Sequence, residues 1–118
     1  MNNRAYYLSS CSTCKRILSE ISLPESVKLI DIKEQPIQED ELDALREKVD
    51  SYESLLNKRA QLYKQKDLKN KTLSEEDYKS LLLEHYTFLK RPVFLIDGQI
   101  FVGNDKNTII QLKQFLNV

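Results

Sequence analysis

Two cysteines, Cys11 and Cys14, are the residues whose type and spacing best suit chemistry, and they are the only cysteines in the chain. They lie between an apolar run, Ala5–Leu8, and a segment with the pattern of an amphipathic helix, Lys15–Ile21. The dipole and the unpaired N–H groups of a helix N-terminus favour a thiolate, which is the nucleophilic form of cysteine. A CxxC pair between a strand and a helix is therefore a candidate redox pair.

Two structural uses of these cysteines are weaker hypotheses. A zinc site needs about four N or S ligands, and the chain offers one histidine besides the two cysteines, so we expect no metal. A disulfide across two intervening residues closes too small a loop to stabilise a fold much. The remaining alternative to redox or nucleophilic use is a pair of reduced, unused thiols.

Length and charge limit the class of protein. The 118 residues suffice for about one domain with a single core. Lys+Arg and Asp+Glu both number 18 and are interspersed, so we expect no direct binding of nucleic acid or of an anionic membrane. No apolar run approaches the roughly 18–20 residues of a membrane span, and the first residues lack the apolar region of a signal peptide. We therefore expect a cytoplasmic protein, in which a cysteine pair is usually reactive or reduced.

The sequence predicts two groups of short strands and helices, one around the cysteines and one near the end of the chain. The pattern predicts a strand at Ala5–Leu8, a helix over about 12–22 and a strand at Val27–Ile32, which form a parallel βαβ unit. Towards the end, Asp97-Gly98 is a favoured type I′ turn between two apolar runs. It predicts a hairpin followed by a terminal helix, in this order: Val93–Ile96, Gln99–Val102, and a helix marked by Ile109, Leu112 and Leu116.

The middle of the chain has no proline or glycine between Pro36 and Leu89, and leucines alternate there with charged residues. Ser74 and Asp77 have the spacing of a capping box at a helix start. The lysine-rich segment 64–72 is interpreted as a solvated linker or helix end. Three apolar stripes at helical spacing predict three inserted helices: Leu42, Leu45 and Val49; Leu55, Leu56, Ala60 and Tyr63; Tyr78, Leu82, Tyr86 and Leu89.

These elements together predict an α/β protein with more helix than strand. The order is β-α-β, a helical insertion, a β-hairpin and a final helix, so helices would flank a small mixed β-sheet. A thioredoxin-like fold with an inserted helical subdomain is the simplest architecture of this kind. We expect one domain over 1–118, with a core at about 1–35 and 88–118 and the insertion at about 36–87.

Three motifs resemble the ArsC/Spx family, which contains glutaredoxin-coupled arsenate reductases, Spx regulators of RNA polymerase and YffB-type relatives. Tyr7–Arg16 looks like the opening of the family, Leu55–Arg59 resembles its "LLN(K/R)R" segment, and Leu89–Val93 is close to its "KRPV" signature. Gly103 falls where a glycine follows the last strand of the family. The resemblance spans nearly the whole chain and implies a thioredoxin fold with a helical insertion.

The resemblance also implies roles for single residues. Cys11 matches the nucleophilic cysteine, and Cys14 matches the second cysteine of Spx-type members. Arg91 matches an arginine that binds the oxyanion, and Pro92 matches a proline, usually cis in this fold, that faces the cysteine loop. Arg59 matches an arginine of Spx and YffB-type sequences, although pairing with Glu53 is its other interpretation.

Residues beside the cysteines are assigned from their types. We expect Ser12 and Thr13 to cap the first turn and to present N–H groups to an anion or a thiolate. Lys15 is the neighbouring cation expected to lower a thiol pKa. His85 is interpreted as a partly buried structural residue.

Two departures from the family bear on arsenate. Arsenate reductases place arginines where this chain has Asn57 and Asn104-Asp105, and an acidic side chain is a poor partner for a dianion. We therefore expect arsenate reduction to be weak or absent.

The leading hypothesis is a thiol-dependent reductase of the ArsC-like family. Cys11 would attack a disulfide, a glutathione mixed disulfide or an oxyanion, and Cys14 would resolve the intermediate. No cofactor would be bound, and glutathione, glutaredoxin or thioredoxin would restore the dithiol. The alternative is a Spx-like redox-sensing transcriptional regulator that binds RNA polymerase, and a third is a redox-inert adaptor.

Overall fold

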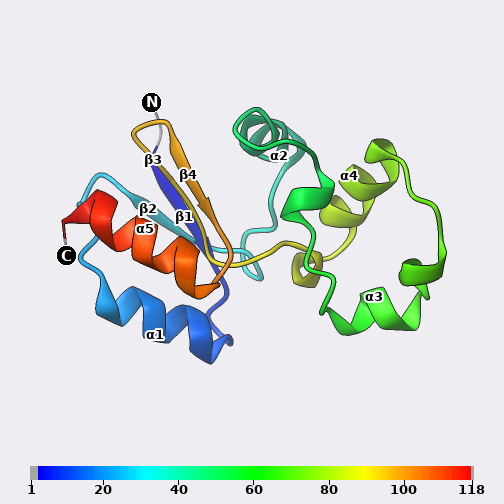
Figure 1. Cartoon of the computed structure of the whole chain (residues 1–118), viewed down its shortest axis with the longest axis horizontal. Helices are drawn as coiled ribbons and strands as arrows, with labels where there is room; N and C mark the ends of the chain where they lie inside the picture. Colours follow the sequence, from blue (N-terminus) through cyan, green and yellow to red (C-terminus); the bar gives the residue numbers. More distant parts are fainter. Residues whose placement is uncertain (1–2, 118) are drawn as a thin grey trace. The chain divides into compact units, whose positions relative to one another are not determined.

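The computed structural model describes residues 3–117. The chain forms two compact units, which are described separately (Figure 1). The sheet unit comprises the residues up to Gln35 and from Arg91 onwards, and the helical unit comprises Pro36–Lys90.

The sheet unit contains four strands in the order β2-β1-β3-β4. Strand β1 pairs in parallel with β2, and β3 pairs antiparallel with both β1 and β4, so the predicted small mixed sheet is confirmed. The strands are β1 (Arg4–Tyr7), β2 (Lys28–Asp31), β3 (Val93–Ile96) and β4 (Gln99–Val102).

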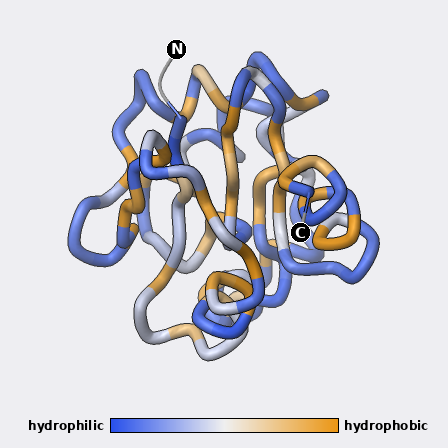
Figure 2. Tube along the Cα trace, turned by 90° about the vertical axis from the view of Figure 1, so that its left-hand side faces the viewer, coloured by the Kyte–Doolittle hydropathy of each residue, from blue (hydrophilic) through white to orange (hydrophobic). Residues whose placement is uncertain are grey.

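Helices α1 (Ser12–Glu20) and α5 (Lys106–Leu116) lie side by side on one face of this sheet (Figure 1). Apolar and polar residues alternate along both helices (Figure 2), and the apolar stripes turn toward the sheet. Their shared core includes Ala5, Ile17, Phe94 and Leu112, all of which have no exposed surface. The same face fixes the start of α1, and thus the cysteines, against the sheet.

The β3–β4 hairpin has the predicted bounds because its turn residues accept the required backbone. Asp97 and Gly98 have φ values of 50° and 79°, and a type I′ turn needs positive φ at both central positions. The Asn3 side chain also accepts a hydrogen bond from the Asp97 N–H at 2.9 Å.

The helical unit contains three α-helices, as predicted, and three short 3-10 turns, of which two lie between the helices and the third follows α4. The capping box is confirmed: the Ser74 hydroxyl accepts from the Asp77 N–H at 3.2 Å, and the Asp77 carboxylate accepts from the Ser74 N–H at 2.9 Å. The elements are α2 (Glu39–Arg46), η1 (Glu53–Leu55), α3 (Gln61–Gln65), η2 (Leu68–Asn70), α4 (Glu75–Glu84) and η3 (Tyr86–Phe88).

The predicted extents of the inserted helices were wrong for all three apolar stripes, each of which continues beyond its helix: Val49 follows α2, Leu55, Leu56 and Ala60 precede α3, and Tyr86 and Leu89 follow α4. Leu56 and Leu89 are not helical; both are extended and form an antiparallel bridge with each other. Two backbone bonds reinforce the bridge, from the Asn57 N–H to the Phe88 carbonyl at 2.7 Å and from the Lys90 N–H to the Leu55 carbonyl at 2.8 Å. At these positions the apolar residues are buried because two distant segments pair with each other, and not because they form one face of a helix.

The sheet, its two covering helices and the helical segment between β2 and β3 form the predicted thioredoxin-like fold with a helical insertion. Within residues 3–117, no helix has the length and apolar character needed to cross a membrane.

Candidate active site

The cysteine pair occupies the turn from β1 into α1. The Cys11 N–H donates to the Leu8 carbonyl at 3.0 Å, which closes a tight turn after the strand. Cys11 is the N-cap of α1, with extended backbone (φ −92°, ψ 111°), and its carbonyl accepts from the Lys15 N–H at 3.2 Å. Cys11 is half-buried, Cys14 is fully buried inside the first helical turn, and both are reduced.

The environment of Cys11 favours its thiolate. Partial burial raises its pKa, but the N–H of Cys14, hydrogen bonding from the Cys14 thiol, the positive charge of Arg91 and the N–H of Thr13 together outweigh that effect. The net result is a Cys11 pKa lowered from the ordinary value of 9.0. The Cys11 sulfur makes no full capping hydrogen bond to the helix. The N–H groups act on it as dipoles of the first helical turn.

The environment of Cys14 has the opposite effect. Burial is the largest influence and raises its pKa to about 11, and the sulfur and charge of Cys11 add to the increase. The N–H of Leu8 and the charge of Arg91 lower the pKa but do not compensate. The pair is therefore asymmetric: one sulfur is prepared to ionise and the other retains its proton.

Arg91 and Pro92 lie immediately before β3. Their peptide bond is cis, as the resemblance implied, and the Pro92 carbonyl accepts from the Gly103 N–H at 2.9 Å. Arg91 is half-buried, and its charge lowers the pKa of both thiols. It is therefore the cation of the cysteine site.

Of the other residues predicted to lie beside the cysteines, one acts on Cys11 and two are exposed to solvent. Thr13 presents its N–H toward Cys11, whereas Ser12 is exposed. Lys15 is exposed, and the groups that dominate the pKa of either thiol do not include it. The cation that acts on the thiols is instead Arg91, from the segment just before β3, whereas the Lys15 side chain lies in solvent.

Arg59 belongs to the helical unit, whereas the cysteine turn and Arg91 belong to the sheet unit. The Arg59 N–H donates to the Asn57 side-chain oxygen at 3.1 Å, and its side chain is exposed. The proposed pairing with Glu53 is instead made by Lys58, at 2.5 Å.

His85 has a structural role, in agreement with its interpretation from sequence. Its Nδ1 accepts from the Thr87 N–H at 3.2 Å, and its ring stacks on Tyr86 with centroids 4.4 Å apart.

Asp105, one of the departures from the family pattern, is used as a helix cap. Its carboxylate accepts from the Thr108 N–H at 3.1 Å and from the Thr108 hydroxyl at 2.7 Å, at the start of α5. The preceding Gly103 has a φ of +90°, which suits glycine. An acidic residue at this position thus serves the fold.

The sequence analysis missed Asp31, the last residue of β2. Its carboxylate accepts from the Ser9 N–H at 3.4 Å and from the Lys33 N–H at 3.2 Å. Because β1 and β2 are parallel, Asp31 lies in register with Tyr7, immediately before the cysteine turn. That register is the signal that could have identified it: an acidic residue ending a strand beside the strand that leads to the cysteines.

No group of three or more His, Cys, Asp or Glu side chains with metal-binding geometry occurs among residues 3–117. Within the sheet unit, the two thiols are accompanied by the Arg91 guanidinium and by backbone N–H groups. This set can support nucleophilic sulfur chemistry.

Comparisons with known proteins agree with this fold and identify a family. The ArsC family matches residues 6–112 of the chain, which is most of its length. No curated protein sequence is similar enough to count as a match.

Several solved structures resemble this one over nearly their whole length. An arsenate reductase from Vibrio cholerae is 20% identical with a TM-score of 0.74, over 94% of this chain and 97% of that one. SACOL0876 from Staphylococcus aureus is 25% identical with a TM-score of 0.72, over 92% and 96%. An arsenate reductase (ArsC) related protein from Brucella melitensis is 22% identical with a TM-score of 0.68, over 100% and 97%. With its thioredoxin-like fold and a family match that includes the cysteine turn, the chain belongs to the ArsC family.

Proposed function

We propose that this protein is a thiol-dependent reductase in which Cys11 is the nucleophile and Cys14 the resolving cysteine. The observation that carries the proposal is the asymmetry of the pair, a lowered Cys11 pKa beside a Cys14 pKa of about 11. A thiolate is the attacking form of cysteine, whereas a buried, protonated thiol reacts only after its neighbour has formed a mixed disulfide. Membership of the ArsC family supports the same class of chemistry.

In the first step, the Cys11 thiolate attacks one sulfur of a disulfide. A bond forms between Cys11 and that sulfur, the original S–S bond breaks, and the other half leaves as a thiolate that takes a proton from solvent. For a glutathione mixed disulfide, the product is either Cys11 bound to glutathione or Cys11 bound to the substrate.

In the second step, Cys14 resolves the mixed disulfide. Formation of that bond removes the Cys11 thiolate, whose charge and sulfur raise the Cys14 pKa, while the positive charge of Arg91 remains. Cys14 then loses its proton to solvent more readily and attacks the Cys11 sulfur. The bound thiol leaves and an intramolecular disulfide remains.

Two electrons from outside the protein must reduce this disulfide. Two molecules of glutathione, or one dithiol protein such as glutaredoxin or thioredoxin, have the required chemistry. We propose a cytoplasmic setting, where such reductants are abundant.

The test is to trap the intermediate. With a glutathione mixed disulfide as substrate, the Cys14→Ser variant should accumulate one mixed disulfide on Cys11, detected by mass spectrometry of the tryptic peptides. The wild type should yield the Cys11–Cys14 disulfide, and Cys11→Ser should yield no adduct. An adduct on Cys14 in preference to Cys11 would contradict the assigned roles.

The Spx-like alternative uses the same cysteine pair as a sensor. It predicts slow stoichiometric oxidation without turnover, and binding of RNA polymerase that depends on the redox state. Steady turnover with glutathione and glutaredoxin, in the absence of polymerase binding, would favour the reductase.

A further inference from the structure

We infer that Asp31 is a positioning residue: it anchors the turn that presents Cys11, so that the nucleophile remains at the N-terminus of α1. This inference deepens the proposed function and rests on Cys11 being the nucleophile. Asp31 itself contacts neither thiol; it acts through Ser9.

The first step of the argument is the set of donors around the carboxylate. The Ser9 N–H lies 3.4 Å and the Lys33 N–H 3.2 Å from the same Asp31 oxygen, and the Ser9 hydroxyl also donates to the carboxylate. These bonds, the Ser9 hydroxyl first among them, lower the Asp31 pKa, so the group is a carboxylate acceptor at neutral pH. The charge of Lys33 adds to this effect.

The second step is what Ser9 belongs to. Ser9 lies inside the turn that the Cys11 N–H closes on the Leu8 carbonyl at 3.0 Å. Leu8 also directs its N–H at the Cys14 sulfur. One short turn therefore contacts both cysteines, and the Asp31 side chain attaches it to the end of β2, beside the backbone bond from the Ile32 N–H to the Tyr7 carbonyl at 2.9 Å.

The third step is the consequence for Cys11. Its thiolate is favoured by the N–H groups of Thr13 and Cys14, which requires the N-cap backbone conformation of Cys11. A turn released from β2 would let Cys11 leave that conformation and lose those dipoles. The Cys11 pKa would rise and its reactivity at neutral pH would fall.

The direction of the change separates positioning from charge. Removing a carboxylate near a thiol lowers the thiol pKa if the two interact only through space, because like charges disfavour ionisation. Loss of the anchor raises it. Asp31→Ala therefore gives opposite results for the two explanations.

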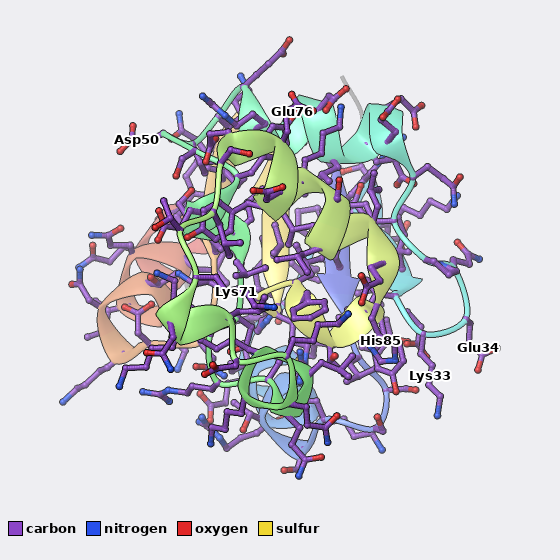
Figure 3. All side chains as sticks on the ribbon, turned by 90° about the vertical axis from the view of Figure 1, so that its right-hand side faces the viewer. Lys33, Glu34, Asp50, Lys71, Glu76 and His85 are labelled. Atoms are coloured by element: carbon purple, nitrogen blue, oxygen red, sulfur yellow. The ribbon has the colours of Figure 1, made fainter. Side chains whose placement is uncertain are left out.

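The experiment measures the rate of iodoacetamide alkylation of Cys11 between about pH 5 and 10, by mass spectrometry, in four variants. Asp31→Ala removes the anchor. Asp31→Ser keeps an oxygen for the Lys33 N–H but is too short to hold Ser9 as well, which provides a second variant if the first fails to fold. Asp31→Asn keeps an acceptor oxygen without the charge. Glu34→Ala removes a carboxylate from the same loop, where Glu34 extends outward into solvent (Figure 3).

We expect Asp31→Ala and Asp31→Ser to move the Cys11 alkylation midpoint upward and to slow alkylation at pH 7 by roughly three- to tenfold, as expected for one lost hydrogen bond to the reacting unit. Asp31→Asn and Glu34→Ala should remain within about twofold of the wild type. A midpoint that is unchanged or lower in Asp31→Ala and Asp31→Ser would overturn the inference, as would an Asp31→Asn variant as slow as Asp31→Ala. The readout is a comparison with the wild type and needs no substrate, so failure here is distinct from a failure to trap the mixed disulfide.

Discussion

At the scale of single residues, the cysteine pair derives its asymmetry from two sources that the sequence places far apart. The N–H groups of Thr13 and Cys14 come from the helix that begins at the pair, whereas the positive charge of Arg91 comes from the segment just before β3. The first source is local and is implied by the CxxC–helix pattern. The second depends on the pairing of β1 with β3.

Replacement of Arg91 should slow Cys11. Its charge lowers the pKa of both thiols, so Arg91→Ala should raise both. Alkylation of Cys11 at pH 7 should fall on the order of tenfold, the effect of removing one nearby opposite charge. Arg91→Lys keeps the charge and should lose less. An Arg91→Ala variant with the wild-type alkylation rate would show that another group stabilises the thiolate.

Arsenate should be a poor substrate. Asp105, in the region where arsenate reductases place an arginine, is committed to capping Thr108, and the Asn57 side chain accepts from the Arg59 N–H. Losing two arginine donors to a dianion could cost about two to four decades of rate, since each charge-assisted bond contributes roughly 1.5–3 kcal/mol. An arsenate titration with glutathione and glutaredoxin tests this. Robust wild-type turnover that collapses in both Arg59→Ala and Arg91→Ala would contradict the expectation.

At the scale of elements, the cap of α5 should be measurable as stability. Asp105→Ala removes the acceptor for the Thr108 N–H and hydroxyl, and should lower the free energy of unfolding by about 1 kcal/mol. Asn104→Ala, at the exposed neighbouring position, is the matched control and should change little. Urea unfolding of both variants decides, and equal stabilities would show that the cap contributes nothing.

Elements fixed by local chemistry could be predicted from the sequence. Asp97-Gly98 specifies its own turn, Ser74 and Asp77 specify a helix start, and the CxxC pair marks the start of α1. These features depend on a few neighbouring residues and on backbone preferences that are the same in any protein.

Elements fixed by distant pairing could not be predicted. Leu56 and Leu89 have apolar spacing that fits helices, yet both are extended. Each is the backbone pairing partner of the other in an antiparallel bridge. The contact between Asp31 and Ser9 has the same origin, since it requires β1 and β2 to be in register. Periodicity within one segment carries no information about such partners.

At the scale of the whole molecule, positive and negative charges are balanced in number, and several carboxylates are held in the ionised form by nearby partners. Five carboxylates have pKa values lowered by hydrogen bonds or ion pairs, with partners that include Lys113 for Glu20, Tyr52 and Lys79 for Asp43, and Lys58 for Glu53. The five are Glu20, Asp31, Asp43, Glu53 and Asp77.

The lowered pKa values of these carboxylates predict that the folded protein loses stability in acid. A carboxylate with a lowered folded-state pKa adds stability that is fully present above its ordinary value, 3.8 for Asp and 4.5 for Glu, and is lost as the pH falls through the folded pKa. The free energy of unfolding should therefore be level from about pH 7 to about pH 5 and should decrease below about pH 4. Urea titrations at a series of pH values test this, and a maximum of stability below pH 4 would contradict it.

The asymmetry of the cysteine pair is the central claim, and competitive alkylation of the wild type tests it most directly. Reduced protein is treated with limiting iodoacetamide across pH 5 to about 11, and the label on each cysteine is quantified by mass spectrometry. The account predicts that Cys11 is labelled first, with a midpoint below its ordinary pKa of 9.0, while Cys14 stays largely unlabelled until the pH nears 11. Labelling of Cys14 first and at the lower pH would reverse the two roles and contradict the account.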